Sequence, residues 1–585
     1  MKRRLIAITM MIVMTLASAF AVTGCKTEDK KSKDPNTINV LISKAGYGTT
    51  FIYDLKEKFE AAYAEEGYKM NVLNPMTDLH SNIMIQDIYS GNGADVYFPG
   101  TVALLQAVDG DYGVMVEDIS DIYDMQPLNL DGTEEQGQTI KEKVQWIDHV
   151  INDDIAYNGK YYTIPWTVQG AGMAVNMNVL GDEYGYTMDQ IPVTTKELFD
   201  ISDNMMENIM LGAAPYTFSL KSNGYCSGTE NNWFIQYEGQ ESYDEYNGFI
   251  NTDGSWRDCI VKGCDGSNCN GHAYDVFKKE GLIEMLAASY ELFDPARQTN
   301  GVASQDFKAA QAQFCAGKSA FYFVSGWMLN EQVGMYAEEM KNIHFVRIPV
   351  ISALGPKLDL CGKGHVEKAA ECFEDCAECE ALLSTIIRGF DAHKSAQEVS
   401  SITGVSVEKV ERVFEARAYV KDGSGTPAVI NAKISEGKKE IVKLLLRMLA
   451  SDEGAALMAK HTNTVNPFNP TCLTGTEYDW LDEITEIFGD DRTIFYDAGS
   501  KEYRAKMGVV NLCPLYGNTV SYTLFTHEVS IFDDKNDYAK VSDRSVYRTA
   551  AYKAIYGDDK DDKYGLGIYG HAKYCLQEEF WKIPE

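Results

Sequence analysis

Beyond its first 25 residues the chain lacks any apolar segment long enough to cross a bilayer, and it is poor in positive charge. Lys and Arg number 53 against 86 Asp and Glu, so the formal net charge is −33. A surface this acidic repels nucleic acid and anionic lipid, so neither is an expected partner. The sequence also lacks a G-x-S-x-G elbow, an H-E-x-x-H pair and a phosphate-binding loop. No cofactor and no catalytic residues are therefore expected.

The N-terminus has the pattern of an export signal. Lys2, Arg3 and Arg4 precede an apolar stretch that runs to about Ala21, and small residues then lead to Cys25. This pattern predicts a secretory signal peptide over residues 1–24. The cysteine after the small residues resembles a bacterial lipoprotein signal, which implies that Cys25 carries the lipid. An uncleaved membrane anchor is the alternative, although the threonines and serine in the stretch disfavour it.

The body of the chain begins with a repeating strand–helix pattern. Residues 25–36 are polar and predict a flexible tether. The following elements are then expected, in order: strand 37–42, helix 51–63, strand 69–73, helix 83–89 and strand 94–98. Strands that alternate with helices predict a parallel sheet covered by helices, and 585 residues are too many for a single core. We therefore expect two or more α/β domains.

Short turn signals punctuate the middle of the chain. Asn158-Gly159 lies between two β-rich runs and predicts a tight hairpin. A helix over residues 306–316 should end at Gly317, which suits a left-handed cap. Trp166 and Trp327 each follow an expected strand, and ligands of α/β sheets gather at strand ends. A late amphipathic helix is expected over residues 436–460, interrupted at Gly454.

Four segments in order resemble the extracellular solute-binding proteins of ABC importers, in the branch that includes maltose-binding protein. Each is similar to a family element: Gly91 to Val96, Tyr157 to Pro165 with Val175-Asn176, Phe314 to Phe321 with Gly326-Trp327, and Lys438 to Lys460. The resemblance spans about residues 37–470. Ala94 stands where the family usually has proline, and Met177 where it has lysine.

The resemblance implies an α/β fold of the periplasmic-binding-protein type (type II), with two lobes joined by crossing strands. One lobe would hold residues 37–163 and 427–465, and the other residues 164–426 and 466–585, with 353–425 as a helical insertion. The implied protein is a monomer, lipid-anchored at the extracellular face of the cytoplasmic membrane. It would capture a carbohydrate, specifically an oligosaccharide, in the cleft and deliver it to the permease subunits of an ABC transporter.

The expected ligand-binding residues follow from the chemistry of sugars. A sugar has polar edges and apolar faces, so its site needs aromatic rings together with amides or carboxylates. Trp166, Trp327 and Trp233 are the expected stacking platforms, with ordinary core packing as the alternative for each. The further candidates are strand-end aromatic residues and polar partners: Tyr47, Phe98, Gln169, Asn232 and Asp95. Asp95 could instead brace a turn.

The cysteines suggest disulfides rather than a metal site. Twelve follow Cys25, an even count in an exported chain, although an organism living without oxygen could leave them as thiols. Cys372-x3-Cys376-x2-Cys379 has the spacing of an iron–sulfur motif, but it lies on an expected helix. The cysteines Cys259, Cys264 and Cys269 lie in a loop rich in Gly, Asn and Asp, where disulfides or free thiols are expected. A zinc site there would need four ligands, and His272 is the only histidine nearby. No metal is expected.

Two other function classes remain open at this point. A surface glycoside hydrolase or lyase needs only two suitably placed carboxylates, which 86 acidic residues do not exclude. An adhesin or purely structural lipoprotein is the third class. Turnover of a glycan would identify the enzyme, whereas a binding protein would only be stabilised by its ligand.

Overall fold

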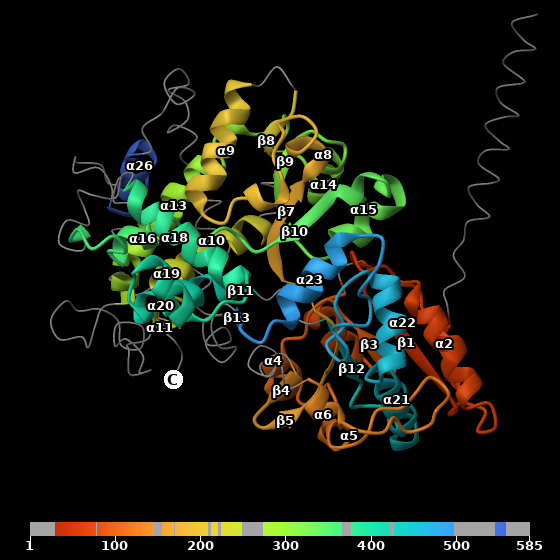
Figure 1. Cartoon of the computed structure of the whole chain (residues 1–585). Coiled ribbons are helices and arrows are strands. Elements are labelled where there is room, and N and C mark those ends of the chain that lie inside the picture. The colour runs from red at the N-terminus through yellow and green to blue at the C-terminus, as the bar shows by residue number, and fades with distance from the viewer. Residues whose placement is uncertain are drawn as a thin grey trace, which may run out of the picture.

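The computed structural model describes residues 30–77, 79–144, 155–168, 170–208, 212–219, 224–248, 273–302, 304–365, 376–421, 426–496 and 545–556. Two β-sheets, each flanked by helices, form two lobes (Figure 1). Within these ranges, no helix combines the length and the apolar character that crossing a membrane requires.

The first lobe is built on a five-stranded sheet of order β2-β1-β3-β12-β6. Its strands are β1 (Thr37–Ile42), β2 (Lys69–Val72), β3 (Val96–Phe98), β6 (Ile164–Thr167) and β12 (Thr426–Ile430). The predicted parallel start is confirmed, because β1 pairs in parallel with β2 and β3. β12 runs antiparallel between β3 and β6. The helices of this lobe are α2 (Phe51–Ala62), α3 (Ser81–Tyr89), α4 (Leu104–Asp109), α5 (Ser120–Tyr123), α6 (Ile140–Lys143), α21 (Glu436–Leu449) and α22 (Asp452–Thr462).

The second lobe is built on a four-stranded sheet of order β10-β7-β9-β8. Its strands are β7 (Ala171–Asn176), β8 (Ala214–Tyr216), β9 (Ser319–Ser325) and β10 (Ile343–Val346). β6 pairs in the first sheet and β7 in the second, so the chain passes between lobes just after β6. The predicted boundary at residues 163/164 would have put β6 in the second lobe.

Helices surround the second sheet and extend away from it. Those near the sheet are α8 (Met177–Leu180), α9 (Thr195–Glu207), α14 (Phe307–Cys315), α15 (Met328–Tyr336) and α23 (Asp479–Gly489). α10 (Gly224–Glu238) also packs against this sheet, where Trp233 meets Phe323 of β9. Those farther out are α11 (Gln240–Gly248), α13 (Glu280–Leu292), α16 (Leu354–Lys357), α18 (Ala377–Asp391), α19 (Ala396–Thr403), α20 (Val407–Ala418) and α26 (Ser545–Tyr556). A small parallel sheet joins β11 (Tyr419–Lys421) to β13 (Ile494–Tyr496). Figure 1 shows α16 and α18–α20 together on the side of the second lobe.

Alternation along the strands places apolar side chains on both faces of each sheet. In β9, Phe321 and Phe323 belong to one hydrophobic cluster, and Tyr322 and Val324 to another. Successive strand residues point to opposite faces, so a strand that is apolar throughout needs cover on both sides. The cluster that contains Tyr322 also contains Ile38, Val40 and Ile42 of β1. The apolar packing is therefore continuous from the first lobe into the second.

Two local predictions are confirmed. β4 (Ala156–Tyr157) and β5 (Lys160–Tyr161) form an antiparallel hairpin, with Asn158 and Gly159 at φ of 50° and 74°. Positive φ at both central residues is what a type I′ turn requires. Gly317 follows α14 with a φ of 71°, as its expected role of ending that helix requires.

The late helix departs from its prediction. It is divided between α21 and α22 at Ala450 and Ser451, and Gly454 lies inside the first turn of α22. Ser451 begins α22 as its N-cap, because its hydroxyl accepts a hydrogen bond from the Gly454 N–H at 3.0 Å. The glycine is therefore not the point of interruption.

Candidate functional site

Three aromatic side chains from separate segments meet where the lobes adjoin. Tyr47 follows β1, Trp166 lies on β6, and Trp327 directly follows β9. The Tyr47 ring is edge-on to Trp166, with centroids 4.9 Å apart, and edge-on to Trp327 at 5.2 Å. Edge-to-face contacts at such distances are favourable for aromatic pairs. The predicted platforms Trp166 and Trp327 are thus brought together through Tyr47, which was also predicted.

The first-lobe side of this cluster is closely packed. Trp166 is fully buried and also contacts Phe51 and the predicted Phe98, with centroids 4.7 and 5.9 Å away. Its indole N–H donates to the Pro427 carbonyl at 3.3 Å. Burial raises the pKa of Tyr47 to about 12, and the neighbouring Ser43 hydroxyl offsets part of this rise. The Tyr47 phenol therefore stays protonated at physiological pH.

Trp327 differs from the other tryptophans that the structure describes, Trp166, Trp233 and Trp480, because part of its surface is exposed. Its indole Nε1 is nevertheless buried and, among the residues that the structure describes, has no hydrogen-bond partner. The same holds for the Ser325 hydroxyl, two residues earlier at the end of β9. Buried polar atoms are normally paired, so each such exception asks for a partner. The hydroxyls of a bound solute would supply partners of the right kind.

Polar contacts hold the two lobes together beside the aromatic cluster. Asn330 of α15 donates through Nδ2 to the Gly46 carbonyl at 2.6 Å and accepts from Asn463 Nδ2 at 3.2 Å. Glu331, the next residue, is held by Gln311 Nε2 at 2.7 Å. Burial raises the pKa of Glu331, although the Gln311 hydrogen bond opposes the change. These contacts join the loop after β1 to the N-terminal part of α15.

Asp95 lies away from this cluster and acts as a brace. It precedes β3, whereas Phe98 ends that strand, so the two residues lie at opposite ends of it. Its Oδ2 accepts from the Asn39 backbone N–H at 2.7 Å and from Lys438 Nζ at 2.7 Å. The residue is 5% exposed, and the same Oδ2 also accepts from Asn39 Nδ2 at 2.8 Å. Asp95 therefore links β1 to α21, which is a bracing role.

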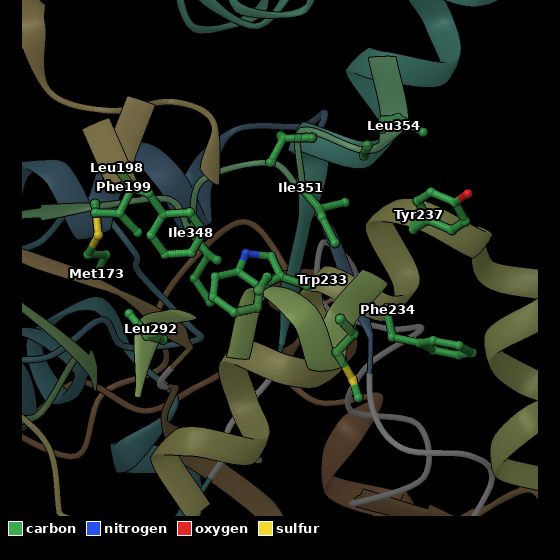
Figure 2. Close-up of a cluster of buried hydrophobic side chains, with 14 of the residues drawn as sticks. Met173, Leu198, Phe199, Trp233, Phe234, Tyr237, Leu292, Ile348, Ile351 and Leu354 are labelled. Carbon is green, nitrogen blue, oxygen red and sulfur yellow. The ribbon is translucent and has the colours of Figure 1, made fainter. Parts of the chain in front are cut away.

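Trp233 and Asn232 belong to the interior of the second lobe. Figure 2 shows Trp233 among Met173, Leu198, Phe199, Ile348 and Leu292. Trp233 is fully buried, and its Nε1 donates to the Pro349 carbonyl at 3.1 Å. Asn232 is buried too and accepts from the Tyr496 hydroxyl at 3.0 Å. The structure does not join these two residues to the Tyr47 cluster.

Two predicted residues cannot be placed. Gln169 and Cys25 both lie outside the described residues. Gln169 falls in the one-residue gap between Val168 and Gly170, where the chain passes from the first lobe to the second. Its neighbours in the sequence thus lie close to Trp166.

Among the residues that the structure describes, the cysteines follow the free-thiol alternative rather than the suggested disulfides. Cys315, Cys361, Cys376, Cys379 and Cys472 are all free thiols, and the remaining cysteines lie outside the described residues. Cys376 and Cys379 do come together, but with Cys361 and His365. In the sequence they share a motif with Cys372, which lies outside the described residues. The sequence feature that could have pointed to this group is the pair Cys361-x3-His365, which lies upstream of the pair Cys376-x2-Cys379.

Comparisons with known proteins agree with this architecture. The model of the family described as bacterial extracellular solute-binding protein matches residues 54–365. Comparison with curated proteins finds no match.

Solved structures with a similar fold include a chitin oligosaccharide binding protein, with a TM-score of 0.50 at 11% identity over 87% of this chain and 97% of that one. Two others also give TM-scores of 0.50 at 12% identity. One is RafE in complex with raffinose, where the match covers 88% of this chain and 97% of that one. The other is maltose-bound MalE3 of T. maritima, where it covers 88% of this chain and 98% of that one. At such identities the likeness shows the two-lobed fold alone. The family match covers more than half of the sequence, and the chain belongs to the bacterial extracellular solute-binding proteins, which are receptors of ABC import rather than enzymes.

Proposed function

We propose that this protein captures a carbohydrate, specifically an oligosaccharide, between its lobes and delivers it to the membrane permease subunits of an ABC transporter. The observation that carries the proposal is the cluster of Tyr47, Trp166 and Trp327 at the junction of the lobes. Aromatic faces are the surfaces on which the apolar faces of sugar rings stack. The structurally similar proteins described above, which are a chitin oligosaccharide binding protein, a raffinose complex and a maltose-bound protein, support the same ligand class.

Within the cluster we assign different tasks to the aromatic residues. Trp327 would stack on the sugar, because it is the one of the three with exposed surface, and its unpaired Nε1 would donate to a sugar oxygen. Tyr47 separates Trp327 from Trp166 in this closed arrangement. Parting of the lobes would take Trp327 away from Tyr47, since the two rings belong to different lobes. Trp166 and Phe98 would form the floor beneath Tyr47, and Gln169 would add an amide.

The experiment is thermal unfolding of residues 26–585 against a panel of oligosaccharides, with peptides as a second panel. A ligand at 100 times its dissociation constant stabilises the native state by about 2.7 kcal/mol, which raises the midpoint of unfolding. We expect one class of oligosaccharide to raise it and to remain intact. The rise should disappear in Trp327→Ala and persist in Trp327→Phe, which keeps a stacking ring.

The matched control removes an aromatic ring elsewhere in the first lobe. Tyr89 of α3 is 63% exposed, and its ring packs against Tyr112 rather than against Tyr47, Trp166 or Trp327. Tyr89→Ala should keep the full response to sugar. A response to peptides alone would overturn the carbohydrate assignment, and an unchanged response in Trp327→Ala would overturn the site.

We propose further that the protein is attached to the outer face of the membrane through a lipid on Cys25. The support is the order of a basic start, an apolar stretch and the small residues before that cysteine. Acyl chains contribute about 0.8 kcal/mol per buried methylene, so two chains hold a protein firmly. Partition of the full chain into detergent, abolished by Cys25→Ser, tests the anchor.

A further inference from the structure

The second lobe contains a compact group of three cysteines and one histidine. The potential ligand atoms of Cys361, His365, Cys376 and Cys379 all lie within 4.8 Å of one another. Cys361 Sγ is 3.1 Å from His365 Nε2 and 3.8 Å from Cys376 Sγ. Sulfurs bound 2.3 Å from a tetrahedral zinc ion are about 3.8 Å apart, whereas a disulfide requires about 2.05 Å. The sulfur separation therefore has the value of a zinc site.

The loop after α16 presents the first two ligands. Asp359, Gly362 and Gly364 have φ of 45°, 69° and 77°, so the loop turns sharply on both sides of Cys361. The Asp359 carboxylate accepts from the backbone N–H groups of Gly364 and His365 at 3.1 and 3.3 Å. These bonds bring His365 back over Cys361. A Cys-x3-His segment in an extended chain could not place both ligand atoms this close.

The N-terminus of α18 presents the other two ligands. Cys376 is the N-cap residue, and its sulfur accepts from the Cys379 N–H at 3.4 Å. Cys379 lies in the first turn and is fully buried. Both sulfurs therefore lie at the N-terminal end of α18, within 4.8 Å of the Cys361 sulfur and the nearer His365 ring nitrogen. Lys363 and Glu378 form an ion pair of 2.5 Å between the same two segments.

We propose that Cys361, His365, Cys376 and Cys379 bind one zinc ion that has a structural role. Three sulfurs and one imidazole nitrogen form a donor set that suits zinc. Four protein ligands complete a tetrahedral shell and leave no open position for water or substrate, which distinguishes a structural site from a catalytic one. Binding releases the thiol protons and turns no substrate over.

The zinc would tie the outer helices to the rest of the second lobe. α18 already contacts α9, where Ser384 donates to Glu197 at 2.5 Å and Arg388 pairs with the same carboxylate at 3.1 Å. The metal would add a link from the α18 N-terminus to the loop after α16. It would also join the two ends of residues 366–375, because His365 and Cys376 flank that segment. Metal binding of this kind contributes directly to folding stability.

The test measures metal in the chain of residues 26–585 purified from zinc-supplemented cells. We expect about one zinc ion per chain, the stoichiometry of a single Cys₃His site. Cobalt should replace the zinc and produce thiolate-to-cobalt charge-transfer bands with the intense visible bands of tetrahedral coordination. Cys376→Ser should lose most of the zinc, whereas Cys472→Ser, which removes a half-buried thiol outside the group, should keep it.

Thiol counting on the unmodified chain keeps the proposal testable if Cys376→Ser fails to fold. Three thiols should become reactive when a chelator removes the metal, and the midpoint of thermal unfolding should fall at the same time. Several results would overturn the proposal. They are a chain without zinc after zinc supplementation, equal zinc content in Cys376→Ser and the unmodified chain, or a mass 2 Da lower from a bond between these cysteines. Neither sugar binding nor its absence affects the outcome.

Discussion

At the scale of single residues, Gly454 occupies a position that no other residue fits. A Cβ atom built on it would lie 2.0 Å from the Met448 carbonyl oxygen, a backbone atom that cannot rotate away. The close approach arises where α22 begins against the end of α21, with Ser451 capping the new helix. Gly437 in α21 provides the opposite case, because nothing lies within 4 Å of its Cβ position.

We predict opposite effects of alanine at these two glycines. Gly454→Ala forces the start of α22 away from α21 and should lower the free energy of unfolding by about 1–3 kcal/mol, the usual cost of overpacking. Gly437→Ala reduces the freedom of the unfolded chain and should raise it by about 0.4–1 kcal/mol. Denaturant titration of both variants checks the difference. Equal stability of the two variants would contradict the assigned packing.

At the scale of secondary-structure elements, one carboxylate of α23 makes two contacts with the second sheet. Glu483 accepts from the Phe345 N–H of β10 at 2.7 Å and lies 2.6 Å from His344 Nδ1. Trp480 of the same helix packs edge-on against Phe345, with centroids 5.1 Å apart. Burial lowers the pKa of His344, but the hydrogen bond and charge of Glu483, with Asp479, outweigh it and leave the pKa raised.

This attachment should weaken as the pH rises. A histidine with a raised pKa in the folded state contributes stability that is complete below its unfolded pKa of about 6.5 and is lost above the folded value. We therefore expect the stability difference between the unmodified chain and His344→Gln to be larger at pH 6 than at pH 9. Thermal unfolding at both pH values measures it. A difference independent of pH would contradict a charged pair at this position.

At the scale of the whole molecule, the two lobes are in contact around Gly46. A Cβ atom there would lie 2.4 Å from Glu331 Oε1 and 3.2 Å from Glu331 Cγ, across the junction of the lobes. Glu331 has little room to move, because it is partly buried and its carboxylate is held by Gln311. Hinge bending is the usual motion of two-lobed binding proteins. Gly46 is therefore placed to control closure.

We predict that Gly46→Ala favours an open arrangement of the lobes. The clash should cost the closed form about 1 kcal/mol, or roughly a fivefold shift in the equilibrium, at the low end of overpacking costs. Small-angle scattering should show a larger radius of gyration than for the unmodified chain. Gly334→Ala in α15, where nothing lies within 4 Å, is the matched control and should not change it. An unchanged radius in both would mean that Gly46 does not limit closure.

The sequence by itself determined the features that depend on neighbouring residues. Asn158-Gly159 specifies its hairpin because both residues tolerate positive φ, and Gly317 ends α14 for the same reason. The parallel start of the first sheet was predictable from apolar runs alternating with helical stripes. Motif order along the chain was enough to identify the family, which the family match bears out.

Only the tertiary structure decided which side chains meet. Trp166, Trp233 and Trp327 were all predicted from the sequence as stacking platforms, yet Trp233 lies in a lobe interior, Trp166 lies beneath Tyr47, and Trp327 is partly exposed at the junction. Cys361 and Cys376 are adjacent although ten undescribed residues separate their segments. Side-chain burial and ligand geometry depend on contacts between distant segments, and these arise from packing of whole elements rather than from local propensity.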